Sequence, residues 1–338
     1  MTQPAPVRAV GVRDVAAHAG VSTQTVSRVL NGHPHIRPET RQRVLDAIQA
    51  LGYRINNAAR ALGTSTSRTL GVVASDAALY GPAEGVAALE AAARTGGRWI
   101  ATAYADAADA SSVEAAVGHL LAQGVDGIVL VAPHTRTLEA ATAAAPGVPI
   151  VALHGGTGVA TQSAGAALAV AHLIDLGHRR IAEVAGPGDW LEATARSRGV
   201  ADALDSAGLT LVARWEGDWS AAAGYALSEA VAEALGRAQA PTALAVANDQ
   251  MALGLMAGLR AQGIDVPREV SVVGFDDNPD SAFYLPALTT VRLDLASEAR
   301  RVVAEVVGAQ GEAFAEPPVL VVRDSAIPLG DSVIPLGD

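Results

Sequence analysis

The stretch "VSTQTVSRVLNGHPHIRPETRQRV" (residues 21–44) contains four arginines and one acidic residue, although the whole chain carries a net charge of −11. The excess of arginine extends over residues 1–68, which hold nine arginines and three acidic residues, a balance of +6. The other residues, 69–338, hold fifteen arginines and 32 acidic residues, a balance of −17. A basic end on an acidic chain predicts a polyanion-binding head that is joined to a separate body.

The spacing of apolar residues predicts three short helices in this head. Residues 12–19 have apolar residues at helical spacing, and Gly20 ends this first helix. Ser22 is a suitable N-cap for a second helix that reaches about residue 30. A third helix begins at Pro38, which suits a first turn. Its expected apolar stripe is Val44, Leu45, Ile48 and Leu51. Two short helices that meet at a tight turn, with a third beneath them, predict a helix-turn-helix.

The second helix has side chains that can read base edges. Its apolar side is Val26, Val29 and Leu30, and its polar side is Thr23, Gln24, Ser27, Arg28 and Asn31. Arginine bonds guanine bidentately, glutamine bonds adenine, and serine or threonine serves bases or phosphates. The alternative is a pair of solvated basic helices with ordinary polar surfaces. The turn, the charge and the polar face together favour DNA binding.

The segments "VRDVAAHAGVSTQTVSRVLNG" and "RPETRQRVLDAIQALGYRINNAARAL" resemble the head of the lactose-repressor family of bacterial transcription regulators. The resemblance continues over roughly residues 10–325. It implies base reading by Thr23, Gln24 and Arg28, and contacts at or near phosphate by Ser27, Asn31 and His35. Two positions differ from the family pattern. Arg37 replaces a serine N-cap, so the cap of the third helix should be weaker. Thr23 replaces a bulky aromatic residue of the member that gives the family its name, so the operator need not be the same.

Residues 55–63, "INNAARALG", follow the head. The resemblance implies a hinge helix that folds in the minor groove, where the small Ala59 allows close approach and Leu62 opens a base step. A helix this short is unstable alone, so its order should depend on DNA and on a partner hinge. The alternative is a plain linker that contains a leucine by chance.

From residue 69 onward, short apolar runs alternate with amphipathic helical segments. This alternation predicts parallel sheets that are covered by helices on both faces. The strand-like runs are 69–75, 99–104, 127–132, 149–153, 180–186, 243–248, 270–275 and 318–323.

The resemblance implies that this α/β core consists of two Rossmann-like lobes of the type I periplasmic-binding-protein class, a division that composition does not show. The expected domains are a helix-turn-helix domain (1–54), a hinge and linker (55–68), a core (69–325) and a disordered tail (326–338). Within the core, the N-lobe covers about 69–160 and 293–316, and the C-lobe about 161–290 and 317–325.

Polar and aromatic residues follow several of the predicted strands, where ligands of such sheets bind. Trp219 offers a flat apolar face for a sugar ring, and planar polar groups on other residues can bond adjacent hydroxyls. With the resemblance, these features predict an effector site made of Ser75, Leu79, Pro82, Arg196, Trp219, Asn248 and Asp276. Asp249 is expected to cap the following helix, although a role in ligand binding is open. Three further departures leave the sugar open between a galactoside, a β-glucoside and a plant-derived oligosaccharide: His154, Leu293 and Leu295.

Other classes of protein are disfavoured. No Walker motif, dinucleotide loop, metal-ligand spacing or nucleophile–base pair is present, so we expect no enzyme, no cofactor and no metal site. The chain has no cysteine, no export signal and no apolar run of membrane-spanning length, so we expect a cytoplasmic protein.

The predicted function is a dimeric, sequence-specific DNA-binding repressor that a sugar releases from a pseudo-palindromic operator. No heptad repeat follows the body, so the zipper of the tetrameric family member is not expected. Two alternatives stay open: a solute-binding receptor for a sugar transporter, and a member of the same family whose ligand is a corepressor.

Overall fold

A computed structural model describes residues 10–30, 33–53, 66–131, 134–156, 158–309 and 316–331. They belong to two compact units, Met1–Ser67 and Arg68–Asp338, which we call the head and the core.

The head contains α1 (Val12–Ala19), α2 (Thr23–Leu30) and α3 (Pro38–Leu51), so the predicted helix-turn-helix is confirmed. Gly20 ends α1 in the left-handed conformation, with φ 65°, which glycine adopts without steric cost. The backbone N–H of Thr25 donates to Ser22 Oγ at 3.1 Å, which caps α2. Arg37 gives α3 no side-chain cap, as expected from the missing serine.

The three helices bury a small apolar centre that includes Val15, Val26 and Val44. The predicted stripe on α3 is wrong at Leu45, which is 45% exposed, whereas Ala47 is buried. Residues 44, 47, 48 and 51 follow helical periodicity, and this rotates position 45 away from α1 and α2.

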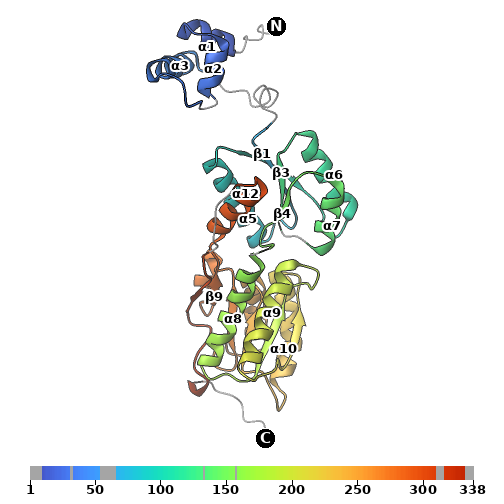
Figure 1. Cartoon of the computed structure of the whole chain (residues 1–338). Coiled ribbons are helices and arrows are strands. Elements are labelled where there is room, and N and C mark those ends of the chain that lie inside the picture. The colour runs from blue at the N-terminus through green and yellow to red at the C-terminus, as the bar shows by residue number, and fades with distance from the viewer. Residues whose placement is uncertain are drawn as a thin grey trace, which may run out of the picture. The chain divides into compact units, whose positions relative to one another are not determined.

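The N-lobe of the core is a parallel four-stranded sheet in the order β2-β1-β3-β4. Its strands are β1 (Thr69–Ala74), β2 (Trp99–Tyr104), β3 (Gly127–Val131) and β4 (Ile150–Ala152). One face packs against α5 (Tyr80–Thr95) and α12 (Leu295–Val306), and the other against α6 (Ala110–Ala122) and α7 (Thr135–Ala144) (Figure 1).

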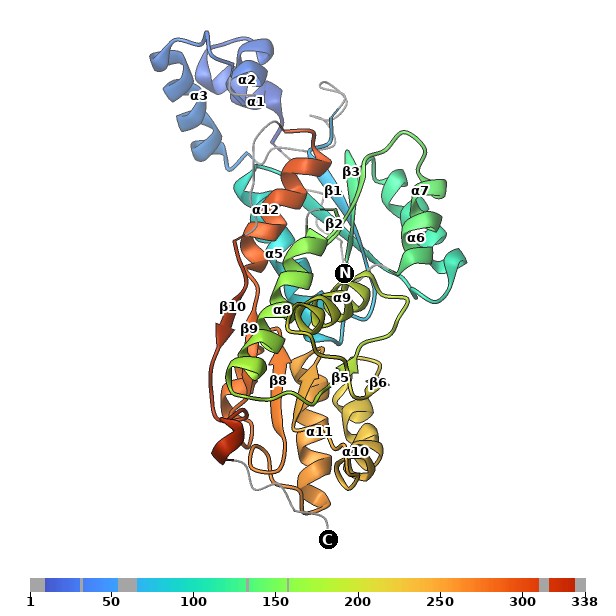
Figure 2. The same cartoon turned by 60° about the horizontal axis from the view of Figure 1, so that its bottom comes forward.

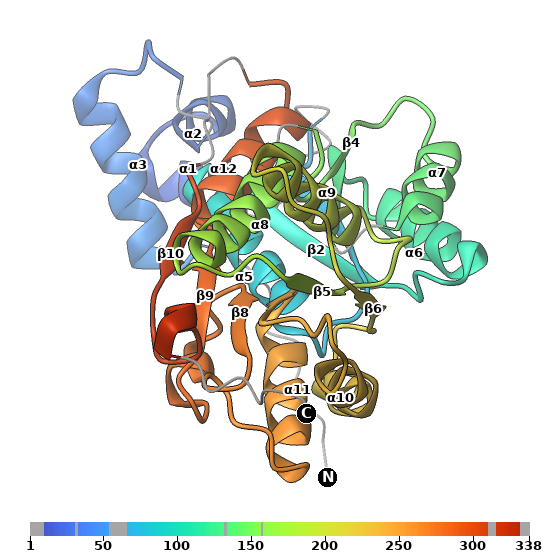
Figure 3. The same cartoon turned by 90° about the horizontal axis from the view of Figure 1, so that it is seen from below.

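The C-lobe is a six-stranded sheet in the order β10-β9-β8-β7-β5-β6. Its strands are β5 (Ile181–Ala185), β6 (Arg214–Glu216), β7 (Ala243–Val246), β8 (Ser271–Phe275), β9 (Thr289–Arg292) and β10 (Val319–Val321). Helices α8 (Gly158–Asp175) and α9 (Leu191–Ser206) cover one face. Helices α10 (Ala221–Leu235) and α11 (Asp249–Ala261) cover the other and lie side by side (Figure 3).

Two features of this sheet differ from the sequence prediction. The short strands β6 and β9 were not expected, and β10 pairs with β9 in the antiparallel direction. A three-residue strand such as β6, with the burial pattern exposed, half-buried, exposed, lacks the continuous apolar run on which the prediction relied.

The chain passes between the two lobes three times: from β4 to α8, from β9 to α12, and from α12 to β10. The elements that these passages connect to, α8, α12, β9 and β10, lie on one side of the core (Figure 2). Three separate connections allow the lobes to rotate about a shared set of crossover segments.

The prediction of a disordered tail from residue 326 is wrong for residues 326–331. Ala326 is buried, and the carbonyl of Ile327 lies 3.0 Å from Nε2 of the buried His178. The backbone N–H of Leu329 donates to the carbonyl of Leu176 at 2.9 Å, and a short 3-10 helix, η2 (Leu329–Asp331), follows. His178 and Leu176, which follow the end of α8, hold this segment together with Ser271 of β8, whose Oγ accepts from the N–H of Ile327 at 3.1 Å. Residues 332–338 lie outside the described residues.

Among the residues described, no helix combines the length and apolar character that crossing a membrane requires.

Candidate functional site

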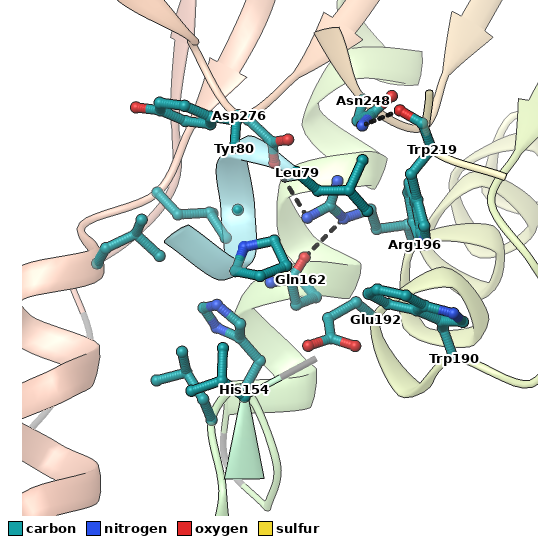
Figure 4. A pocket seen from close by; sticks show the side chains of 16 residues that line it. Leu79, Tyr80, His154, Gln162, Trp190, Glu192, Arg196, Trp219, Asn248 and Asp276 are labelled. Carbon is teal, nitrogen blue, oxygen red and sulfur yellow. Dashed lines mark hydrogen bonds and ion pairs between the residues drawn. The ribbon is translucent and has the colours of Figure 1, made fainter. Parts of the chain in front are cut away.

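A pocket of about 680 Å³, partly open to solvent, lies between the two lobes of the core. It sits at the carboxyl ends of strands from both sheets, which is the usual place for ligands in open α/β folds. Its lining residues are Leu79, Tyr80, Gly81, Pro82, Val131, Leu153, His154, Gln162, Trp190, Glu192, Arg196, Trp219, Asn248, Asp276, Leu293 and Leu295 (Figure 4).

Arg196, from α9, is the centre of the polar side of this pocket. Its Nη2 lies 3.1 Å from Oδ1 of Asp276, and its Nε donates to Oε1 of Gln162 at 2.8 Å. Nη1 donates to the carbonyl of Ala247, and the guanidinium carbon lies 3.9 Å from the centroid of the Phe275 ring. These contacts fix the plane of the guanidinium group, so its remaining N–H groups have a defined direction.

Asp276 and Asn248 follow β8 and β7 at adjacent positions of the sheet. Burial raises the pKa of Asp276, and Arg196 opposes that rise. Asn248 caps α11: its Oδ1 accepts from the N–H of Met251 at 2.9 Å, while its Nδ2 donates to the carbonyl of Trp219 at 3.0 Å. One N–H of the Asn248 amide is therefore left for a ligand.

The prediction that Asp249 caps α11 is wrong, because Asn248 does so. Asp249 is fully buried, and its carboxylate accepts from Thr290 Oγ1 at 2.6 Å and from the N–H of Asn278 at 2.8 Å. Burial and the nearby Asp276 raise the pKa of Asp249 to about 8. Asp249 thus connects α11 to the loop that carries Asp276, and it does not line the pocket.

Two tryptophans form the aromatic wall. Trp190 and Trp219 pack edge to face with ring centroids 5.5 Å apart. Trp219 has a φ of 74°, and two other lining residues, His154 and Asp276, also have positive φ, 59° and 111°. Strained backbone of this kind clusters at ligand sites, because the surrounding fold must hold it in place.

The N-lobe side of the pocket is mostly apolar. Leu79 and Pro82 come from the start of α5, Leu293 from the passage between β9 and α12, and Leu295 is the first residue of α12. Tyr80 and His154 are the polar side chains on this side. Burial lowers the pKa of His154 to about 4, so the imidazole is neutral at physiological pH. Its backbone N–H donates to Oε1 of Glu298 at 3.0 Å.

The structure brings six of the seven predicted effector residues to this one pocket. Ser75 is buried just after β1 and is not among the lining residues. Sequence reasoning missed Gln162, Trp190 and Glu192. A signal for Glu192 was present: it precedes Arg196 by four residues on one helix, so the two side chains share a face. Gln162 could be found only by knowing that α8 packs against α9.

The contacts that join the lobes beside the pocket include two that involve side chains. Nδ1 of His134, at the start of α7, lies 3.0 Å from Oδ2 of Asp189 in the C-lobe. The backbone N–H of Tyr80 donates to Oε1 of Gln250 at 3.0 Å. Each contact would have to break or move if the lobes changed their relative orientation.

In the head, Thr23, Gln24, Ser27, Arg28 and His35 are exposed. The first four lie on the side of α2 opposite the buried Val26 and Val29, as predicted. Asn31, Ala59 and Leu62, together with residues 54–65, lie outside the described residues. Nowhere in the described ranges do three or more His, Asp or Glu side chains gather as a metal ion would require.

A helix-turn-helix head on a two-lobed core with a pocket between the lobes defines a class: DNA-binding regulators whose core is of the periplasmic-binding-protein type. Residues 12–56 match the bacterial regulatory proteins of the lacI family, and residues 170–330 match the periplasmic binding protein-like domain. The lactose operon repressor of Escherichia coli (strain K12) is 37% identical over 295 residues, which cover 85% of this chain and 81% of the relative. Catabolite control protein A of Priestia megaterium is 32% identical over 292 residues, 83% and 87% of the two chains.

Solved structures agree with these matches. The lac repressor dimer bound to operator and the anti-inducer ONPF superposes with a TM-score of 0.75 at 33% identity, covering 95% of this chain and all of that one. The complex of the transcriptional regulator CelR with cellobiose has a TM-score of 0.65 at 31% identity, covering 94% and 99%. The chain therefore belongs to the lacI family of bacterial regulatory proteins, and it is a DNA-binding transcriptional regulator.

Proposed function

We propose that this protein is a dimeric repressor whose affinity for a pseudo-palindromic operator is controlled by a carbohydrate bound in the pocket between the lobes. The observation that carries this proposal is the convergence of Arg196, Asn248, Asp276 and Trp219 at one pocket, in a chain that also has a DNA-reading head. Hydrogen-bonding groups beside an aromatic face suit a sugar ring, and solved relatives contain ONPF or cellobiose.

A second copy of the chain would supply the second head. Phe283, Leu285 and Tyr225 are 83%, 73% and 53% exposed. Tyr225 lies on α10, Phe283 is the last residue of η1 (Pro279–Phe283), and Leu285 follows shortly after it. The backbone N–H of Asn278 donates to Asp249, which joins η1 to α11, and α11 packs against α10. Large exposed apolar side chains at neighbouring elements favour a protein interface. We assign this surface to the same chain because the lac repressor structures are dimers.

Ligand binding in the pocket and operator binding by the head are thermodynamically linked in this proposal. A ligand that binds one lobe arrangement better than the other shifts the population of that arrangement and changes operator affinity by the same coupling free energy, typically 1–3 kcal/mol. The contacts His134–Asp189 and Tyr80–Gln250 are where the two arrangements would differ. We propose that the ligand is an inducer, which separates the paired hinges and weakens operator binding. A ligand that instead strengthened operator binding would be a corepressor.

A gel-shift titration with and without sugars tests the proposal. Operator-length DNA should bind at moderate salt, and an effector sugar should change the midpoint. A solute-binding receptor would not bind DNA, so the absence of binding would favour that alternative. Because the protein is a DNA-binding regulator, we propose that it acts in the cytoplasm. We also propose that the pocket holds its ligand without chemical turnover.

Arg28→Ala is expected to weaken operator binding by about 1–3 kcal/mol and to relax the preference at one base pair. The exposed Arg28 lies on the polar side of α2, where a guanidinium can bond guanine. Binding to a set of single-base operator variants measures this effect. A uniform loss on every sequence would mean that Arg28 contacts phosphate alone.

Trp219→Leu is expected to weaken sugar binding by about tenfold or more, equivalent to about 1.4 kcal/mol, because the flat face for the sugar ring is lost. Operator binding without sugar should stay the same, since the head does not contain this residue. The gel shift with and without sugar measures both. An unchanged sugar response would place the effector site elsewhere.

A further inference from the structure

Buried polar atoms without a partner gather at the pocket. Five such side-chain atoms occur among the described residues, and three of them belong to lining residues: Nε2 of Gln162, Oε2 of Glu192 and Nε1 of Trp219. A fourth, Nε2 of His134, belongs to the residue whose ring lies 4.9 Å from Trp190. Native proteins leave few buried polar atoms unpaired, so such a group of them points to a missing ligand.

Among these residues, Glu192 is the one whose unpaired atom belongs to an acidic group. It is 8% exposed, and its carboxylate points into the pocket (Figure 4). Arg196 is the nearest cation in sequence, but it is engaged by Asp276, Gln162 and Ala247. A buried carboxylate oxygen without a hydrogen-bond donor is costly to the folded protein.

Gln162 supplies the complementary group. Its Oε1 accepts from Arg196, which fixes the amide so that Nε2 is the unpartnered atom. Gln162 and Glu192 come from α8 and α9, which pack side by side, so a donor and an acceptor lie on one wall of the pocket. A hydroxyl group can accept from the first and donate to the second.

The charges of the lining residues narrow the choice of ligand. Arg196 is balanced by Asp276, and His154 is neutral at physiological pH. At a pH above its pKa of about 7, Glu192 is mostly ionised and leaves one negative charge in excess. A phosphate or carboxylate group of a ligand would meet that charge in a site of low dielectric, where repulsion between like charges is strong.

We propose that Glu192 is a specificity-determining residue that accepts a hydroxyl group of an uncharged carbohydrate, assisted by Gln162, and that it rejects phosphorylated and acidic sugars. This inference rests on the proposed function and names the chemical class of its effector. It also gives a role to Oε2 of Glu192, which has no hydrogen-bond partner in the protein although burial raises the pKa of this carboxyl group to about 7: the ligand supplies the partner.

The proposal predicts opposite effects on stability and on binding. Glu192→Leu removes the unpaired carboxylate, so the ligand-free protein should gain about 5 °C in Tm at neutral pH. The same variant should bind the sugar at least about tenfold more weakly. Glu192→Gln keeps an acceptor oxygen and should recover part of the affinity. A residue with a purely structural role would lower Tm when replaced.

The test is a thermal-shift titration of the full chain with cellobiose, lactose, methyl β-glucoside and methyl β-galactoside, with glucuronate, galacturonate and the sugar phosphate esters as anionic counterparts. Glu183→Gln is the matched control. Glu183 is also buried, but Ser197 Oγ lies 2.5 Å and Arg214 Nε 3.2 Å from its oxygens, outside this pocket. Its replacement should lower Tm and leave sugar binding unchanged.

We expect at least one neutral sugar, and none of the anionic ones, to raise the Tm of the wild type. The inference is overturned if that sugar binds Glu192→Leu as tightly as the wild type, or if anionic sugars bind equally well. Should no sugar raise the Tm at all, the carbohydrate part of the proposed function fails, and this inference falls with it. Operator binding without sugar, measured by the gel shift, tests the DNA-binding part of the proposed function separately from these sugar titrations.

Discussion

Arg196→Met is expected to lower the free energy of unfolding of the core by about 3–5 kcal/mol, since removing one partner of a buried ion pair leaves the other charge uncompensated. The side chains of Arg196 and Asp276 are only 10% and 15% exposed. The substitution would also remove the donors to Gln162 and to the carbonyl of Ala247. Methionine fills much of the same volume, so the loss reports the polar contacts.

Tryptophan fluorescence during urea unfolding of the full chain measures this loss. All four tryptophans, at positions 99, 190, 215 and 219, lie in the core, so the signal follows the core alone. Arg237→Met is the control, because Arg237, just after the end of α10, pairs with Glu233 of α10, and their side chains are 66% and 72% exposed. Such exposed pairs contribute about 0–1 kcal/mol. An equal loss in both variants would contradict the role given to the buried pair.

Asp276→Asn in the Arg196→Met background extends the argument. Asparagine removes the unpaired charge and tolerates a positive φ better than most residues, which matters at a φ of 111°. The double variant should therefore recover part of the stability. Sugar binding should be lost in both the single and the double variant, because neither restores the Arg196 guanidinium that lines the pocket.

Two of the effector residues that sequence reasoning found, Asn248 and Asp276, directly follow a strand. Asn248 and Asp276 come one to two residues after β7 and β8, and the carboxyl ends of neighbouring parallel strands meet at one edge. Arg196 and Trp219 came from the family resemblance. Local sequence also sufficed for the three helices of the head, where the caps and apolar periodicity agree.

Features that depend on long-range packing were not predictable in this way. Gln162 and Glu192 share a pocket wall only because α8 and α9 pack together. The order of residues 326–331 depends on His178 and Leu176, about 150 residues earlier in the chain. The capping role of Asn248, rather than Asp249, depends on Thr290 and Asn278, which hold the Asp249 carboxylate away from the helix end.

The stability advantage of Glu192→Gln over the wild type is expected to grow by about 3 kcal/mol between a pH of about 4 and a pH of about 8. Burial raises the pKa of Glu192 from 4.5 to about 7, Arg196 opposes the rise and Asp276 adds to it. The folded protein therefore keeps a proton that the unfolded chain releases above pH 4.5. The wild type loses stability as the pH rises through this window, and the loss is complete above the folded pKa. Glutamine carries no such proton.

Urea unfolding of both proteins at a series of pH values, followed by tryptophan fluorescence, measures this difference. Comparing the two proteins cancels the contributions of His154, whose pKa is lowered, and of Asp249, whose pKa is raised to about 8. Asp249→Asn should show a gain of its own that continues to a higher pH, in keeping with its higher pKa. A difference between Glu192→Gln and the wild type that stayed constant with pH would mean that the Glu192 carboxylate has a partner in solution, and the unpaired acceptor on which effector selection depends would not exist.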